Sequence, residues 1–194
     1  MVQELVDTFE ELKKYVFIIN RKSNKPIIIK FNNDNFYHLV GLHKINIDTF
    51  FPTYIKSKYK KYKYIKKNTK KFEGILNNHI KEKDSLEFRI KTFHNILDLL
   101  KNNDNTILYN LKQKVPGSVY NGDFGLFKIF EDMYCLFGLK EEKENENFIY
   151  CAPQSWMAGN RTNRLIQGKK PIYMENISFV PISAFNDNFC EVHI

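Results

Sequence analysis

The sequence predicts an α+β fold in which an antiparallel β-sheet packs against several helices. Helical apolar spacing is concentrated in the first half of the chain, and short β-branched and aromatic runs follow one another in the last third. No internal repeat and no Pro- or Gly-rich linker divides the 194 residues, of which 43% are hydrophobic. We therefore expect residues 1–194 to form one domain.

The N-terminal segment predicts a helix followed by a β-hairpin. Apolar residues recur at helical spacing between charged ones over residues 2–14. Two β-branched and aromatic runs, residues 15–19 and 26–31, are then separated by the polar connector NRKSNK. The connector is rich in turn formers, so the two runs are expected to pair as neighbouring strands.

A short second helix is predicted over residues 35–44. Asn33 or Asp34 can cap it, because a side-chain oxygen there accepts from the free N–H groups of the first turn. On a continuous helix His43 shares the apolar face, whereas His38 points nearly opposite to it. We therefore expect His43 to be a buried neutral imidazole and His38 to be the accessible one.

One segment, residues 56–71, carries the positive charge of the chain. It contains no acid, and its nine lysines exceed the whole formal net charge of +8. The residues concerned are Lys56, Lys58, Lys60, Lys61, Lys63, Lys66, Lys67, Lys70 and Lys71, interleaved with Tyr59, Tyr62 and Tyr64. Lysines that follow phosphates and tyrosines that stack on bases predict contact with single-stranded or looped RNA. A solvated helix face is the alternative, and the sequence leaves open whether the segment is a helix or a loop.

The remaining elements follow from periodicity and turn residues. A helix is predicted over residues 85–101, while residues 107–114 fit either a helical turn or a strand. Three apolar runs separated by polar stretches predict a meander of antiparallel strands: FGLFKIF, MYCLFGL and NFIYCA. Pro153 can begin a short helix in the polar segment that follows, and residues 171–182 return to strand composition.

The segment YVFIINRKSNKPIIIKFNNDNFYHLVGLHK resembles the opening of a family of phage-associated nuclease-like domains. This family is the fourth phage group of the barnase, EndoU, colicin and RelE-like (BECR) superfamily. The most specific part is the Phe-x-His-Leu-x-Gly-Leu motif from Phe36 to Leu42, and an APQSW-like segment follows a later strand. The resemblance implies a helix packed on an antiparallel sheet and a metal-independent ribonuclease activity typical of toxins and phage effectors. It carries over only His38, because members of the superfamily vary their acid and base groups.

Metal-independent RNA cleavage needs a base near the 2′-oxygen, a cation at the phosphorane and an acid at the 5′-oxygen. His38 is the candidate for proton transfer, and a structural hydrogen bond is its alternative role. Lys44, Arg161 and Arg164 are the candidates for stabilising phosphate charge. The alternatives are a merely solvated lysine at Lys44 and a capped surface loop that contains the two arginines. Arg89, inside a predicted helix, is expected to form a structural salt bridge.

Several classes of site are not supported by the sequence. There is no HExxH, GxxxxGK or GxGxxG motif, and the three cysteines form no CxxC pair, so we expect no metal and no cofactor. No segment resembles a signal peptide or is long enough to cross a bilayer, and the Lys-, Asn- and Ile-rich composition is typical of low-GC bacteria and their phages. We expect the protein in the cytosol of a bacterial host, with no membrane partner.

Two functional classes remain. The first is a metal-independent ribonuclease that serves as a phage or mobile-element toxin or effector. The second is a noncatalytic phage-encoded inhibitor or RNA-binding regulator that uses the basic segment to bind nucleic acid. An acidic antitoxin or an acidic host protein is a further candidate partner, because basic surfaces attract acidic ones.

Overall fold

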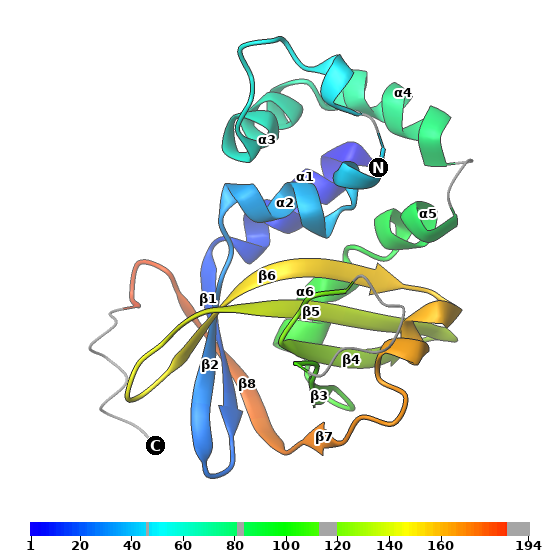
Figure 1. Cartoon of the computed structure of the whole chain (residues 1–194). Coiled ribbons are helices and arrows are strands. Elements are labelled where there is room, and N and C mark those ends of the chain that lie inside the picture. Colours follow the sequence, from blue (N-terminus) through cyan, green and yellow to red (C-terminus); the bar gives the residue numbers. More distant parts are fainter. Residues whose placement is uncertain (46, 81–83, 113–119, 186–194) are drawn as a thin grey trace.

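Within residues 1–45, 47–80, 84–112 and 120–185, which the computed structural model describes, eight strands form one strongly twisted sheet. Helices α1 to α5 gather on one side of it, as Figure 1 shows. The strands are β1 (Tyr15–Arg21), β2 (Asn24–Lys30), β3 (Ile107–Asn110), β4 (Phe124–Phe130), β5 (Met133–Glu144), β6 (Ile149–Ala158), β7 (Pro171–Ile172) and β8 (Met174–Pro181). The predicted α+β class is confirmed.

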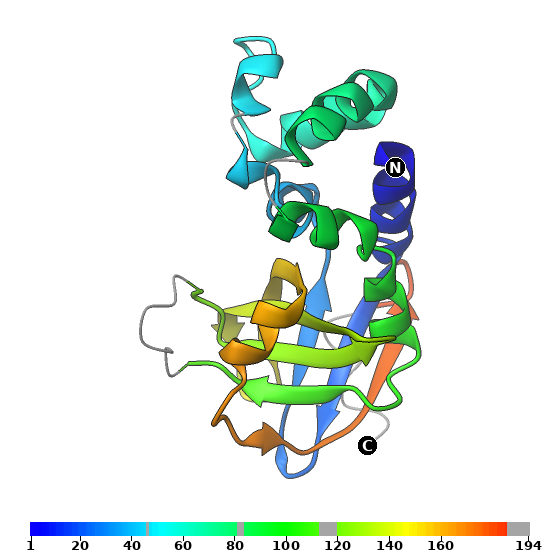
Figure 2. The same cartoon turned by 90° about the vertical axis from the view of Figure 1, so that its right-hand side faces the viewer.

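Most helical segments lie between β2 and β3 in the chain; α1 precedes β1, and η3 follows β6. The α-helices are α1 (Val2–Leu12), α2 (Asn33–Leu39), α3 (Lys58–Lys67), α4 (Thr69–Ile80), α5 (Asp84–Lys91) and α6 (Asn95–Lys101). The 3-10 helices are η1 (Leu42–Lys44), η2 (Ile47–Phe50) and η3 (Asn160–Leu165). Helices α3 and α4 lie farthest from the sheet in both Figure 1 and Figure 2. None of the helices in the described ranges is long and apolar enough to cross a bilayer.

One parallel pairing joins the N-terminal hairpin to the last third of the chain. The strand order is β7-β3-β4-β5-β6-β2-β1-β8, and the pairs are antiparallel except β2 and β6, in which Ile28 lies opposite Tyr150. The predicted antiparallel sheet is thus correct apart from this pair. Helix α2 follows β2 directly and lies on β6, where the Asn35 Nδ2 donates a 3.1 Å hydrogen bond to the Pro153 carbonyl.

Three aromatic rings form the centre of the core between the first three helices. Phe9 of α1 and Phe36 of α2 have ring centroids 5.2 Å apart, and Tyr62 of α3 lies 5.2 Å from the first and 4.8 Å from the second. All three side chains are almost completely buried. Edge and tilted contacts of this kind add to the gain from burial, so α3 is held firmly on α1 and α2.

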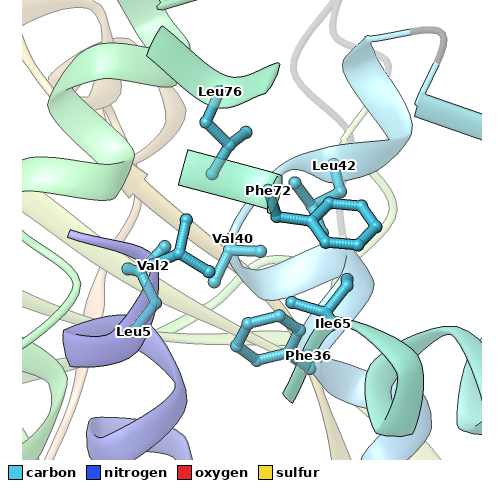
Figure 3. A pocket seen from close by; sticks show the side chains of 8 residues that line it. All are labelled: Val2, Leu5, Phe36, Val40, Leu42, Ile65, Phe72 and Leu76. Atoms are coloured by element: carbon cyan, nitrogen blue, oxygen red, sulfur yellow. The ribbon is translucent and has the colours of Figure 1, made fainter. Parts of the chain in front are cut away.

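A small apolar cavity marks the seam between these helices and α4 (Figure 3). Its volume of about 10 Å³ corresponds to roughly one water molecule. The lining side chains are Val2, Leu5, Phe36, Val40, Leu42, Ile65, Phe72 and Leu76. Because all eight are apolar, the cavity offers no polar partner to a bound molecule, and we interpret it as a packing defect in the seam.

The structure corrects two predictions in the second half of the chain. The helix predicted over residues 85–101 is divided into α5 and α6 by a tighter turn, in which the Phe93 N–H donates to the Ile90 carbonyl at 3.3 Å and the Asn95 N–H donates to the Thr92 carbonyl at 3.0 Å. The Thr92 hydroxyl in this turn accepts a 3.0 Å hydrogen bond from the Trp156 indole N–H. Pro153 does not begin a helix but lies within β6, opposite Leu139 at a shift in the β5–β6 register. A proline lacks the N–H that a regular ladder needs, which suits it to such an irregularity. The ambiguous residues 107–110 form a strand, β3.

Candidate active site

A glycine turn brings the two histidines of the motif together. Helix α2 begins after the N-cap Asn32, one residue before the predicted cap, and ends at Leu39. Gly41 then adopts a left-handed φ of +82°, and η1 follows with His43. The predicted continuous helix is therefore wrong here. His43 is exposed, and its ring centroid lies 4.8 Å from that of His38 instead of on the opposite face.

The basic segment reaches this histidine pair through its first helical residue. The Ser57 hydroxyl caps α3 by accepting from the Lys60 backbone N–H at 3.3 Å. Lys58, in the first turn, places its Nζ 2.5 Å from Nε2 of His38. An ammonium group only donates, so this contact requires Nε2 of His38 to be the acceptor. The contact therefore needs the imidazole to be neutral.

Arg89 of α5 is the second cation in contact with His38. Its side chain is only 4% exposed, and its Nη1 donates a 3.0 Å hydrogen bond to the carbonyl of His38. The Nε has no hydrogen-bond partner, and none of the side chains within the described ranges forms an ion pair with Arg89. The salt bridge expected from the sequence is therefore not found among them. A buried guanidinium with an unused donor is the feature that an anion satisfies.

The surrounding cations lower the pKa of both histidines. Partial burial, followed by the charges of Lys58 and Arg89, lowers the pKa of His38 below its usual value of 6.5. Partial burial and the charges of His38, Arg89 and Lys44 lower the pKa of His43 to about 4, although a hydrogen bond with the Tyr37 backbone opposes the shift. Burial likewise lowers the pKa of Arg89, to about 10. At neutral pH both imidazoles are unprotonated, and the guanidinium beside them remains charged.

The other predicted catalytic cations lie on two 3-10 helices, Lys44 on η1 and the two arginines on η3. Lys44 is half-buried in η1 and contributes to the electrostatics of His43. Arg164 is exposed on η3, beyond the end of β6, and the side chain of Arg161 lies outside the described part of the structure. The arginine whose charge acts on His38 is Arg89. The group formed by His38, His43, Lys58 and Arg89 is called the His–Arg cluster below.

The lysine-rich segment is helical and presents most of its lysines to solvent. It forms α3 and the beginning of α4, which settles the choice between helix and loop. Eight of its nine lysines are exposed: Lys56, Lys58, Lys60, Lys63, Lys66, Lys67, Lys70 and Lys71. Lys66 pairs with Glu10 at 3.1 Å, and Lys71 donates to the Phe50 carbonyl at 3.3 Å.

Three residues of this segment have structural roles that the sequence analysis did not assign. Tyr62 is buried, and its hydroxyl donates to Glu10, so it is not available for stacking on a base. Lys61 is also buried, with its Nζ 2.7 Å from Asp48, and it serves to hold α3 in place. Tyr64 is half-buried and packs against other rings, whereas Tyr59 is 44% exposed and remains accessible.

Among the residues that the structure describes, no group of three or more His, Cys, Asp or Glu side chains is placed to hold a metal ion. Cys135 and Cys151 are buried free thiols, and Cys190 lies outside the described residues. What the cluster can do with its own groups is bind an anion and accept a proton.

The sequence profile of one protein family, described as phage-Barnase-EndoU-ColicinE5/D-RelE like nuclease4, matches residues 1–174. The chain belongs to this nuclease family. The match includes the motif from Phe36 to Leu42 and continues through β6, η3 and β7, so it covers the helices and the described strands of the sheet except β8. The resemblance seen in the sequence is thereby confirmed. No curated protein and no solved structure matches the chain.

The glycine of the motif, Gly41, makes room for the Arg89 side chain. A Cβ at Gly41 would lie 2.9 Å from the Arg89 Cδ, so only a glycine leaves room for the arginine beside the left-handed turn. Sequence analysis could not connect these residues, because Arg89 is 48 positions away and looks like any polar residue of a helix. The available signal was its rarity, since the chain has four arginines.

We expect Gly41→Ala to lower the free energy of unfolding by about 1–3 kcal/mol, because a left-handed residue acquires a Cβ that meets Arg89. Gly74→Ala is the matched control. A Cβ at Gly74 meets nothing within 4 Å, and this position in α4 should gain up to about 1 kcal/mol from better helix propensity. Urea unfolding measures both. Equal effects of the two substitutions would contradict the packing role of Gly41.

We expect Lys58→Gln to raise the pKa of His38, since removing a neighbouring positive charge favours the protonated imidazole. The pKa of His43 should change little, because Lys58 is not among the causes of its shift. NMR titration of the imidazole resonances measures both. Lys56→Gln, which removes the same charge from an exposed position, is the control, and an identical response of His38 in both variants would refute the direct contact.

Proposed function

We propose that this member of the nuclease family is a metal-independent endoribonuclease whose active site is the His–Arg cluster. The observation that carries the proposal is Arg89, a buried cation with an unused Nε donor beside two neutral histidines. A phosphate bound against the exposed Lys58 and the two histidines lies in the electric field of Arg89, whose charge no carboxylate of the described ranges neutralises. Arginine and lysine at this position are suited to the charge of a phosphorane.

The proposed reaction uses the ribose 2′-OH as the nucleophile. On substrate binding Lys58 moves from Nε2 of His38 to the phosphate, which frees the lone pair of that nitrogen. His38, neutral at pH 7, then takes the proton of the 2′-OH at Nε2 as the 2′-oxygen attacks phosphorus, and Arg89 and Lys58 stabilise the extra negative charge. The bond to the 5′-oxygen breaks, which leaves a 2′,3′-cyclic phosphate and a 5′-OH. The bound phosphate raises the pKa of the neighbouring His43, which takes up a proton from solvent before the reaction and donates that proton to the leaving 5′-oxygen.

The exposed lysines of α3 and α4 are proposed to hold the rest of the RNA. Those of α3 lie on the same helix as Lys58, which belongs to the His–Arg cluster, so RNA held along α3 would reach the cluster through this residue. Tyr59 is the tyrosine of this segment proposed to stack on a base, and a Lys63 ammonium over its ring at 4.4 Å fixes its position. Lys44, Arg161 and Arg164 are proposed to contact further phosphates.

The biological role proposed with this activity is that of a phage or mobile-element toxin or effector in the cytosol of a bacterial host. An unregulated ribonuclease harms the cell that makes it. An acidic antitoxin that covers the lysines of α3 is the partner that fits this role, since its charge complements theirs.

The second candidate function is a noncatalytic RNA-binding protein. The observation that favours it is the low pKa of His43, about 4, which leaves this histidine unprotonated at neutral pH in the free chain. Such a protein would bind the same RNA and leave it intact. The two functions differ in the fate of the RNA, not in the surface that binds it.

We expect the protein to cleave single-stranded RNA in the presence of EDTA, and His38→Ala to slow cleavage by about 10²- to 10⁴-fold, the usual effect of a general base. His94→Ala, which removes an exposed histidine of another helix end, should retain full activity. The measurement is single-turnover cleavage of an end-labelled oligonucleotide. Intact RNA with the wild type, or equal rates for wild type and His38→Ala, would exclude the proposed catalysis.

We expect the triple variant Lys60→Gln, Lys67→Gln and Lys70→Gln to weaken RNA binding and to flatten its salt dependence by about 0.7 in log–log slope for each lost phosphate contact. The matched control carries the same loss of charge on exposed lysines elsewhere, Lys22→Gln, Lys143→Gln and Lys170→Gln. Filter binding over a salt series measures both. A common slope for the two triple variants would show that only net charge matters.

A further inference from the structure

One large aromatic side chain is exposed on α5, the helix that supplies Arg89 to the His–Arg cluster. Phe88 precedes Arg89 on α5 and is 40% exposed, although Arg89 and Ile90 after it are buried. Its backbone is fixed, because the Thr92 hydroxyl donates to the Phe88 carbonyl at 2.7 Å and accepts from the Trp156 indole. Phe88 is therefore a rigidly mounted ring at the surface.

The ring lies against a glycine at the end of β6. Gly159 has a φ of +111°, and a Cβ built on it would lie 3.4 Å from Cδ2 of Phe88. The Gly159 backbone is itself held by two hydrogen bonds of 3.0 Å, from its N–H to the Tyr134 carbonyl and from the Thr162 N–H to its carbonyl. The absence of a side chain at position 159 lets the ring rest on backbone.

The polar residues of η3 begin directly after this glycine. Asn160, Asn163 and Arg164 are exposed there. Phe88 is thus one position before Arg89 in α5, and its ring lies beside the glycine that precedes η3. An exposed aromatic ring beside a polar loop has the surroundings of a base-stacking platform.

We propose that Phe88 binds an unpaired nucleobase of single-stranded RNA, on a nucleotide next to the phosphate bound at the His–Arg cluster. The proposal rests on the proposed function and adds a positioning residue to it. Stacking on a ring selects bases that are free of a partner strand, because a paired base has its faces covered. Phe88 would therefore make the protein prefer single strands and loops over duplexes.

The test uses an RNA oligonucleotide with a 2′-deoxy nucleotide at the cleaved position, which can be bound but not cleaved. Phe88→Ala should weaken binding by about 5- to 150-fold, the effect of losing one stacked base. Phe88→Trp should retain binding, because it keeps a flat ring, whereas Phe88→Leu should lose it despite staying apolar. Tyr173→Ala, which removes a 66% exposed ring elsewhere on the chain, is the matched control and should bind as the wild type does.

A second RNA assigns the contact to one base. When the nucleotide next to the cleaved position is abasic, the wild type should bind as weakly as Phe88→Ala, and the substitution should cause no further loss. Wild-type affinity in Phe88→Ala, or full affinity in Phe88→Leu, overturns the stacking proposal while leaving cleavage by the wild type in place. A wild type that neither binds nor cleaves RNA overturns the proposed function together with it.

Discussion

Helix α2 is fixed from two sides, and the candidate site depends on that constraint. On the sheet side Asn35 is hydrogen-bonded to the Pro153 carbonyl of β6, and on the outer side Phe36 packs against Tyr62 of α3. Neither face of the helix can move without breaking buried contacts. His38, at the end of α2, is thereby held between a lysine from the outer helix and an arginine from α5. The apolar core therefore determines the geometry of the charged groups.

The chain treats its buried cations in two different ways. Lys61 lies 2.7 Å from a carboxylate of Asp48, which offsets much of the cost of removing its charge from water. Arg89 is more deeply buried and has no such partner among the described side chains, so only the His38 carbonyl satisfies it. The first arrangement stabilises the fold. The second arrangement leaves a buried positive charge without a carboxylate partner among the described side chains. Such an arrangement costs folding stability and is typical of binding sites.

The sequence predicts the elements that local periodicity determines, and it fails where contacts between distant residues decide. The first helix, the hairpin and the late strands follow from spacing alone. The division between α5 and α6 does not, because the apolar spacing of residues 86–100 continues across the tighter turn that separates them. The pairing of the two histidines depends on one left-handed glycine, and nothing in the pattern of residues 35–44 distinguishes Gly41 from a tolerated glycine within a helix. Lys61 is the buried lysine of the basic segment because it pairs with Asp48. The two residues are 13 positions apart, and only the folded chain brings them together.

The parallel pairing of β2 with β6 has a consequence for synthesis of the chain. Helix α2 rests on β6, which is more than a hundred residues further along, and Trp156 of β6 also anchors the turn that follows α5. A nascent chain therefore carries both histidines and Arg89 outside the tunnel of the ribosome well before their supporting strand has been translated. During translation the His–Arg cluster therefore lacks the support of β6 until almost the whole domain has left the ribosome.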